Sequence, residues 1–193
     1  MELLQPLWPC LVVGLSLLWM NHIRFQSLTE FGHTYLATGT IGRIKTYGLF
    51  NFHFLSKNLS ALFTLLPRLQ PDAPFIVVSS HGMSVLLTTP ALLYLLRPRA
   101  RETPVDVFWH RLLWCTVAAV AIPHLLYQNT GYEQFGYRFS IDYMPYLVAL
   151  LAVGKHPITR TFKAAIVFGM LVNAFGAVTF KRFAQFYSKE FFP

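Results

Sequence analysis

Charged side chains are scarce in this sequence of 193 residues. Asp, Glu, Lys and Arg make up 12% of it, and only 8 residues are acidic. Soluble globular domains carry about 25% charged residues. Meanwhile 54% of the residues are hydrophobic and 18 are Phe. Because a water-exposed surface of this kind would aggregate, the composition excludes an ordinary soluble domain and predicts an all-α, polytopic membrane protein.

Cysteine and metal-binding patterns are also sparse. The two cysteines, Cys10 and Cys115, lie in separate apolar runs, so they form neither a disulfide framework nor a zinc motif. The seven histidines are scattered without the spacing of metal ligands, and we expect no metal and no other cofactor. P-loop, dinucleotide-binding and nucleophile-elbow motifs are missing as well.

The net charge of +8 points to lipid and not to nucleic acid. Nucleic-acid binding requires basic residues gathered on one soluble face. Here the Lys and Arg residues stand at the ends of apolar runs, where they meet anionic headgroups. We therefore expect membrane lipids as partners.

Five apolar segments are predicted as spans within a single membrane domain over residues 1–193: 7–20, 79–96, 108–127, 143–154 and 164–180. The first lacks a basic leader and a small-residue cleavage site, which indicates a retained anchor. The short connections 97–104 and 155–163 are basic, as cytoplasmic loops are. The N-terminus is therefore expected inside. Residues 21–78 and 128–142 are then expected outside, together with the C-terminal tail, although the basic residues of the tail oppose this.

The long external segment 21–78 contains a predicted helix. Its apolar residues recur at steps of three and four, and Pro67 ends the pattern; they are Phe52, Leu55, Leu59, Leu62, Phe63 and Leu66. The pattern is typical of a helix in the outer headgroup region, and the alternative is an ordinary helix packed on the spans. The stretch 37–48 has three Gly and no sustained period, so we predict a loop there.

Residues 131–154 are the most informative stretch. Glu133, Arg138 and Asp142 lead into an apolar helix of 11 residues, Met144–Gly154, which reaches about 16 Å against roughly 30 Å of hydrocarbon. Ionisable groups at such a depth are usually functional. On a continuous helix Arg138 and Asp142 share a face and can pair, or Asp142 can cap the helix. A substrate role is equally open, because a guanidinium fits a phosphate.

Other polar groups are expected at the same outer boundary, His81 among them. Four phrases carry a family resemblance: NHIRFQSLTEFGHTYL (21–36), GLFNFHFLSKNLSALF (48–63), HGMSVLLTTPALLYLLR (81–97) and GYEQFGYRFSIDYMPYLVALLA (131–152). They resemble the C-terminal half of bacterial multi-span glycosyltransferases of the C superfamily, the relatives of protein mannosyltransferases.

The resemblance implies a multi-pass protein of the bacterial inner membrane that takes a sugar from a polyprenyl-phosphate carrier on the non-cytoplasmic side. It also implies that Arg138 and Tyr137 lie near the carrier phosphate. The family's catalytic acid in the first external loop is not identified, since only Glu30 follows the first span closely. The alternative is a non-catalytic subunit, completed by a partner chain with further spans, or a truncated remnant. A transporter ranks third.

Overall fold

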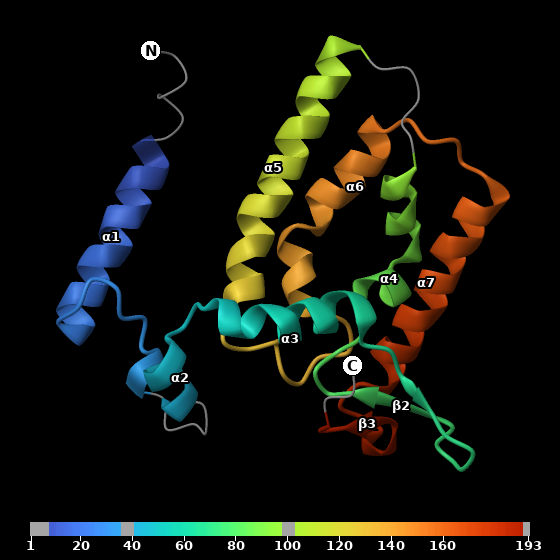
Figure 1. Cartoon of the computed structure of the whole chain (residues 1–193), viewed down its shortest axis with the longest axis horizontal. Coiled ribbons are helices and arrows are strands. Elements are labelled where there is room, and N and C mark those ends of the chain that lie inside the picture. Colours follow the sequence, from blue (N-terminus) through green and yellow to red (C-terminus); the bar gives the residue numbers. More distant parts are fainter. Residues whose placement is uncertain (1–7, 36–40, 98–102, 191–193) are drawn as a thin grey trace. The chain divides into compact units, whose positions relative to one another are not determined.

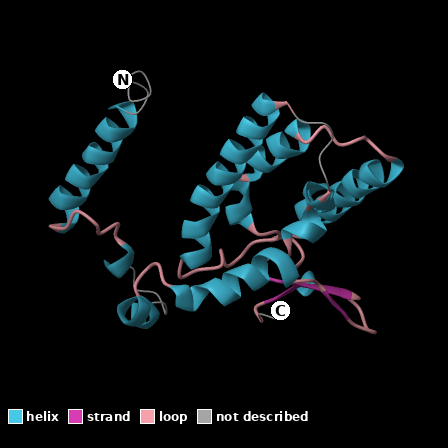
Figure 2. Cartoon of the chain, turned by 45° about the horizontal axis from the view of Figure 1, so that its top comes forward, coloured by secondary structure: helices cyan, strands magenta, loops and turns pink. Residues whose placement is uncertain are grey.

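The computed structural model describes residues 8–35, 41–97 and 103–190. The chain is mostly helical, as predicted, with three short strands (Figures 1 and 2). The elements in chain order are α1 (Trp8–Phe25), η2 (His33–Tyr35), α2 (Ile41–Tyr47), η3 (Phe52–Phe54), α3 (Leu55–Leu59), η4 (Ser60–Thr64), β1 (Arg68–Leu69), β2 (Ile76–Ser79), α4 (Val85–Thr88), η5 (Pro90–Leu96), α5 (Pro104–Leu126), η6 (Arg138–Asp142), α6 (Met144–Val153), α7 (Arg160–Thr179), η7 (Ala184–Phe186) and β3 (Tyr187–Ser188). They form two compact units, residues 1–48 and 49–193.

The first unit contains α1, η2 and α2. Helix α1 covers the described part of the predicted segment 7–20 and continues to Phe25, with apolar side chains exposed along its length. The predicted loop at 37–48 is wrong for Ile41–Tyr47, which form helix α2, and residues 37–40 lie outside the described ranges. A helix of seven residues completes only two turns. It is therefore too short to show the sustained hydrophobic period used in the prediction.

In the second unit, α5 and α7 are the two described helices long and apolar enough to cross a membrane. Each begins at a threonine whose side chain accepts a backbone hydrogen bond, Thr103 for α5 and Thr159 for α7. Thr103 and Asp106 form a capping box, which explains why α5 starts before the predicted residue 108. Only 6% and 11% of their apolar windows are buried, unlike the core helices of soluble proteins. The prediction of five spans is not met.

The predicted span 79–96 is the clearest correction. Strand β2 ends at Ser79, α4 has four residues, and the chain then bends at Thr89 into the 3₁₀-helix η5. Pro90 has no N–H to donate to the preceding turn, so a continuous α-helix is interrupted there. Gly82 adopts a φ of +100°, a second break that side chains disfavour.

The short helix α6 is confirmed within the predicted segment 143–154. Helical elements η3, α3 and η4 follow one another from Phe52 to Thr64 and cross the end of α5 (Figure 1). The predicted apolar stripe is only partly right, because Phe52, Phe63 and Leu66 are exposed. The buried side of these elements instead carries Phe54, Asn58, Ala61 and Leu62, with Leu65 just beyond them.

The inward position of Asn58 has a physical cause. Its Nδ2 donates to the backbone oxygens of Leu125 and Tyr127, at 2.9 and 2.8 Å. These oxygens lie at the C-terminus of α5, where the last carbonyls lack partners within the helix. The amide therefore fixes α3 against α5, and a hydrophobicity pattern alone assigns it to the wrong face.

Three strands bring distant segments together at the same end of this unit (Figure 2). Strands β1 and β2 pair antiparallel, with Arg68 opposite Val77, and β2 and β3 pair parallel, with Val78 opposite Tyr187. A further bridge joins His81 to Gln134. Residues 49–81, 127–142 and 180–190 thus gather at one end, and the side of the membrane that each segment faces stays a prediction.

Candidate functional site

A buried amide organises the segment 131–143. Gln134 is 4% exposed, and its Nε2 donates to the backbone oxygens of His81 and Thr130 at 2.6 and 2.7 Å. Its Oε1 accepts from the backbone N–H of Arg138 at 3.0 Å. The Gln134 side chain therefore fixes the start of η6, where Arg138 stands.

The side chain of Arg138 borders a groove of about 370 Å³ whose wall combines polar and apolar side chains. The groove lies between the 133–144 segment, the end of α4 and helix α7; Thr88, Thr89, Gln134, Ser140, Asn173 and Phe180 contribute to its walls. The guanidinium is 5.5 Å from the centroid of the Phe139 ring. Among the described residues no carboxylate forms an ion pair with Arg138. Its charge is thus available to an anion in the groove.

Gly131 makes room for the Gln134 amide and for Arg138. It has a φ of +87°, and a Cβ built at this position would collide with Oε1 of Gln134 and lie 3.2 Å from Nε of Arg138. A larger residue would be strained here by its backbone conformation and would displace the Gln134 side chain first. The glycine at the start of the segment therefore belongs to the site.

The predicted pairing of Arg138 with Asp142 is wrong. The two residues lie on a 3₁₀-helix, in which residues four apart point about a third of a turn away from each other. Oδ2 of Asp142 is instead 3.3 Å from Nε2 of His124, on the last turn of α5. The capping alternative is also wrong, because Tyr143 occupies the N-cap of α6 and no side chain caps that helix.

Glu133 contacts a different helix. Its Oε2 lies 3.3 Å from Nζ of Lys181, just after α7. Both side chains are more than half exposed, so solvent weakens this pair. Glu133 remains at the rim of the groove, and it brings the end of α7 close to the segment that carries Arg138.

Tyr137 is one of the residues that line the groove, and His81 lies beside it. Tyr137 is 2% exposed, its Oη has no partner among the described residues, and burial raises the pKa of the phenol above its usual range. The phenol is therefore neutral, and it can interact with a ligand only by donating or accepting a hydrogen bond. His81 is partly buried, and its Nδ1 lies 2.8 Å from Oγ1 of Thr130. His81 therefore contacts the segment that carries Thr130, but it does not line the groove.

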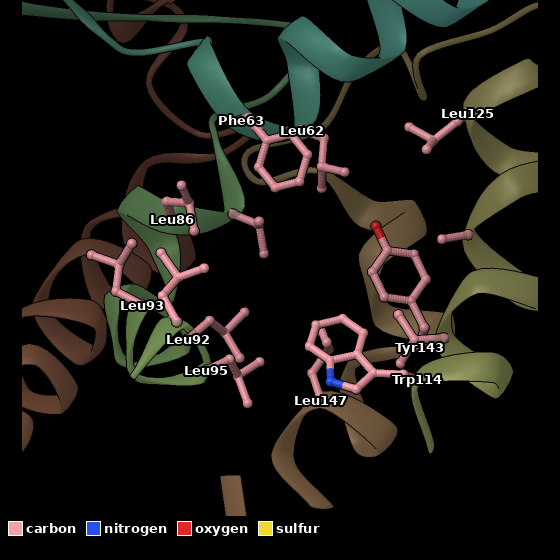
Figure 3. A pocket seen from close by; sticks show the side chains of 14 residues that line it. Leu62, Phe63, Leu86, Leu92, Leu93, Leu95, Trp114, Leu125, Tyr143 and Leu147 are labelled. Carbon is pink, nitrogen blue, oxygen red and sulfur yellow. The ribbon is translucent and has the colours of Figure 1, made fainter. Parts of the chain in front are cut away.

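A second, apolar cavity of about 340 Å³ lies on the other side of these elements (Figure 3). Leucines from α4, η5, α5 and α6 make most of its wall, together with Leu62 of η4 and the ring of Trp114. The Tyr143 ring also lines it. We call the first cavity the Arg138 groove and the second one the Tyr143 crevice.

Three residues that build these sites, Asn58, Gln134 and Tyr143, were not predicted from the sequence. Asn173 donates to the backbone oxygens of Thr88 and Gly169 at 2.7 and 2.8 Å, and so joins α7 to the end of α4. A polar amide inside an apolar run is a signal for such contacts, because unpaired polar groups are costly in lipid. Gln134 carries no such signal, since polar residues are common in its segment, 128–142.

Within the described residues there is no group of three or more His, Cys, Asp or Glu side chains that could hold a metal ion. No protein-family profile, curated protein or solved structure matches this chain.

Proposed function

We propose that this chain is a multi-pass protein of the bacterial inner membrane that binds a polyprenyl-phosphate sugar at the Arg138 groove, on the non-cytoplasmic side. The observation that carries the proposal is the position of Arg138. Arg138 lines a groove that also holds hydroxyl and amide side chains, and its backbone is fixed by the buried Gln134. A guanidinium can give two parallel hydrogen bonds to a phosphate, and these are among the strongest that proteins form.

Membrane placement is supported by α5 and α7. Both are long enough to cross, and few of their residues are buried within the protein. The groove lies at the end of the unit where residues 127–142 and 180–190 gather, so a carrier phosphate there would sit at headgroup level while its tail stays in lipid. The family resemblance of 131–152 supplies the carrier class.

The test is a binding measurement on purified protein in lipid nanodiscs, with undecaprenyl phosphate with and without a hexose as the probes. Arg138→Ala is expected to weaken binding at least about tenfold, since a hydrogen bond to a charged group contributes about 1.5–3 kcal/mol. Arg138→Lys should recover part of the loss, because it restores the charge without the fork. Arg111→Ala is the matched control, since Arg111 is also exposed but lies near the opposite end, on α5.

Unchanged affinity in Arg138→Ala would refute the phosphate contact. Binding of the bare phosphate and the hexosyl phosphate with equal affinity would refute recognition of the sugar and retain only the anion site.

A second candidate is a non-catalytic subunit that binds the carrier for a partner chain. It is favoured by the carboxylates of the 131–143 segment, because Glu133 is paired with Lys181 and Asp142 with His124. Neither is positioned as a free base beside Arg138. Sugar transfer by the purified chain alone would reject this candidate, and carrier binding without transfer would favour it.

A further inference from the structure

The Tyr143 crevice has the shape of a slot for one alkyl chain. Four of its residues, Trp114, Val117, Ala121 and Leu125, follow one face of α5 at steps of three and four. They cover about 16 Å along the helix at 1.5 Å per residue. This is close to half of the roughly 30 Å of hydrocarbon in a bilayer, which is the depth of one leaflet.

The mouth of the crevice is apolar. Phe63, Leu93, Leu96 and Trp114 line it and are 47%, 45%, 83% and 40% exposed, whereas the deeper Leu62, Leu92, Val117 and Leu147 are buried. A mouth of this kind opens toward hydrocarbon and not toward water. Lipid therefore enters it from the membrane more readily than a polar solute does.

One feature of the crevice does not suit a plain hydrocarbon. Tyr143 lines it and is 4% exposed, yet its hydroxyl has no hydrogen-bond partner among the described residues. Figure 3 shows the oxygen directed toward the end of the cavity where Leu62 and Phe63 lie. The other polar atom of the wall, Nε1 of Trp114, already donates to His110 at 3.2 Å. A buried donor without an acceptor is unfavourable, so an oxygen of a bound molecule would relieve it.

We propose that the crevice binds one acyl chain of a membrane phospholipid, with the ester carbonyl accepting a hydrogen bond from Tyr143. Tyr143 stands at the start of α6, at the same end as α3, where the ester groups of a leaflet lie in the proposed membrane placement. The chain then runs along α5 toward Trp114. The volume of about 340 Å³ is at the small end of ligand pockets and limits the occupant to a single chain.

This site is separate from the Arg138 groove. Val85 and Tyr143 line the crevice, whereas Thr88 and Met144 of the same two regions line the groove. A polyprenyl tail is pure hydrocarbon beyond its phosphate and offers no oxygen inside the crevice. The inference rests on the proposed membrane placement but not on the sugar carrier.

The test uses photo-crosslinking in nanodiscs. A diester phospholipid with a diazirine in one acyl chain is the probe, and labelled peptides are mapped by mass spectrometry. Adducts are expected on α5 around Val117 and Ala121. An unlabelled diester lipid should compete better than its diether analogue, which has the same chains and lacks the carbonyl.

Two pairs of variants sharpen the result. Tyr143→Phe should lower labelling of these peptides about two- to tenfold, the effect of one hydrogen bond, while Tyr146→Phe on the same helix should not. Ala121→Phe should fill the crevice and abolish labelling, whereas Ala119→Phe, at an exposed position of α5, should leave it intact. Arg138→Ala should not alter labelling, and Tyr143→Phe should not alter carrier affinity, so the two proposals fail separately.

Equal competition by diester and diether lipids, together with unchanged labelling in Tyr143→Phe, would overturn the assignment. Displacement by undecaprenyl phosphate would assign the crevice to the carrier instead. Stronger competition by a free fatty acid than by the phospholipid would also overturn it.

Discussion

The Arg138 groove and the Tyr143 crevice are neighbours with opposite chemistry. They have similar volumes, about 370 and 340 Å³, and both take wall residues from the α4 region and from the junction of η6 with α6. The wall of the groove combines a cation, hydroxyl and amide groups with apolar side chains, whereas the wall of the crevice is almost wholly leucine and aromatic rings. Adjacent residues, Tyr143 and Met144, face different cavities. The short junction between η6 and α6 thus separates the proposed headgroup site from the proposed acyl-chain site.

Each site also has its own amide clamp at a helix contact. Asn173 joins α7 to the end of α4 beside the groove, and Asn58 joins α3 to the end of α5 beside the crevice. Both donate to backbone oxygens and not to side chains. The comparison indicates that polar residues in this unit mainly place the walls, while few contact a ligand.

The largest effect is expected from Gln134→Leu, which breaks the groove and spares the crevice. It leaves the backbone oxygens of His81 and Thr130 and the N–H of Arg138 without their partner. Each unmet buried group costs about 1–3 kcal/mol, and water reaching this end reduces the sum, so we expect a loss of about 2–4 kcal/mol. Unfolding in mild detergent, monitored by tryptophan fluorescence, measures this loss of stability. Carrier binding should fall as well.

Gln70→Leu is the control for this substitution. Gln70 makes a single side-chain hydrogen bond, from Nε2 to the backbone oxygen of Pro74 at 2.8 Å, in the hairpin between β1 and β2. The expected loss is about 0.5–1.5 kcal/mol with no change in carrier binding. Equal losses for the two variants would mean that Gln134 does not organise the segment.

Substitutions of the two amide clamps, Asn173 and Asn58, are expected to have intermediate effects, and each should affect a different cavity. Asn173→Leu should weaken carrier binding and leave acyl labelling unchanged, whereas Asn58→Leu should do the reverse. Hydrogen bonds between helices in a membrane contribute about 0.6–2 kcal/mol, so each stability loss is expected in that range. The same nanodisc preparations measure both ligands. Loss of both ligands in either variant would show that the cavities are mechanically coupled and do not act as separate sites.

Much of the fold could be predicted because long apolar helices carry their own signal. Helices α5 and α7 follow from runs of apolar residues with a capping threonine at their starts, and the short α6 follows from its apolar run alone. Segment 79–96 could not be predicted in the same way. Its composition suits a span, but Pro90 and Gly82 divide it, and its contacts with α7 and α6 stabilise short pieces that local propensity alone would not.

The charged residues of the candidate site could be predicted from the sequence, but the pairing between them could not. Arg138 could be selected because an arginine next to a short apolar helix is conspicuous. Its separation from Asp142 could not be foreseen, since a 3₁₀-helix and an α-helix have the same sequence signal over five residues. The crevice could not be foreseen either, because its wall comes from η4, the α4–η5 region, α5 and α6, which are separated along the sequence.

The smallest effect is expected from Asp142→Asn, and it tests whether the groove works through Arg138 alone. The Asp142 side chain is 58% exposed and is 3.3 Å from His124, so its carboxylate is directed toward α5 and not toward the guanidinium. Carrier affinity should therefore change by less than about fivefold, since an exposed pair contributes only about 0.2–1 kcal/mol. In the double variant with Arg138→Ala the losses should add within about 0.5 kcal/mol, as they do for residues that do not interact. A coupling larger than that would restore the arginine–aspartate pair as a functional unit. It would mean that η6 rewinds into an α-helix when the carrier binds, because only that geometry places residues four apart on one face.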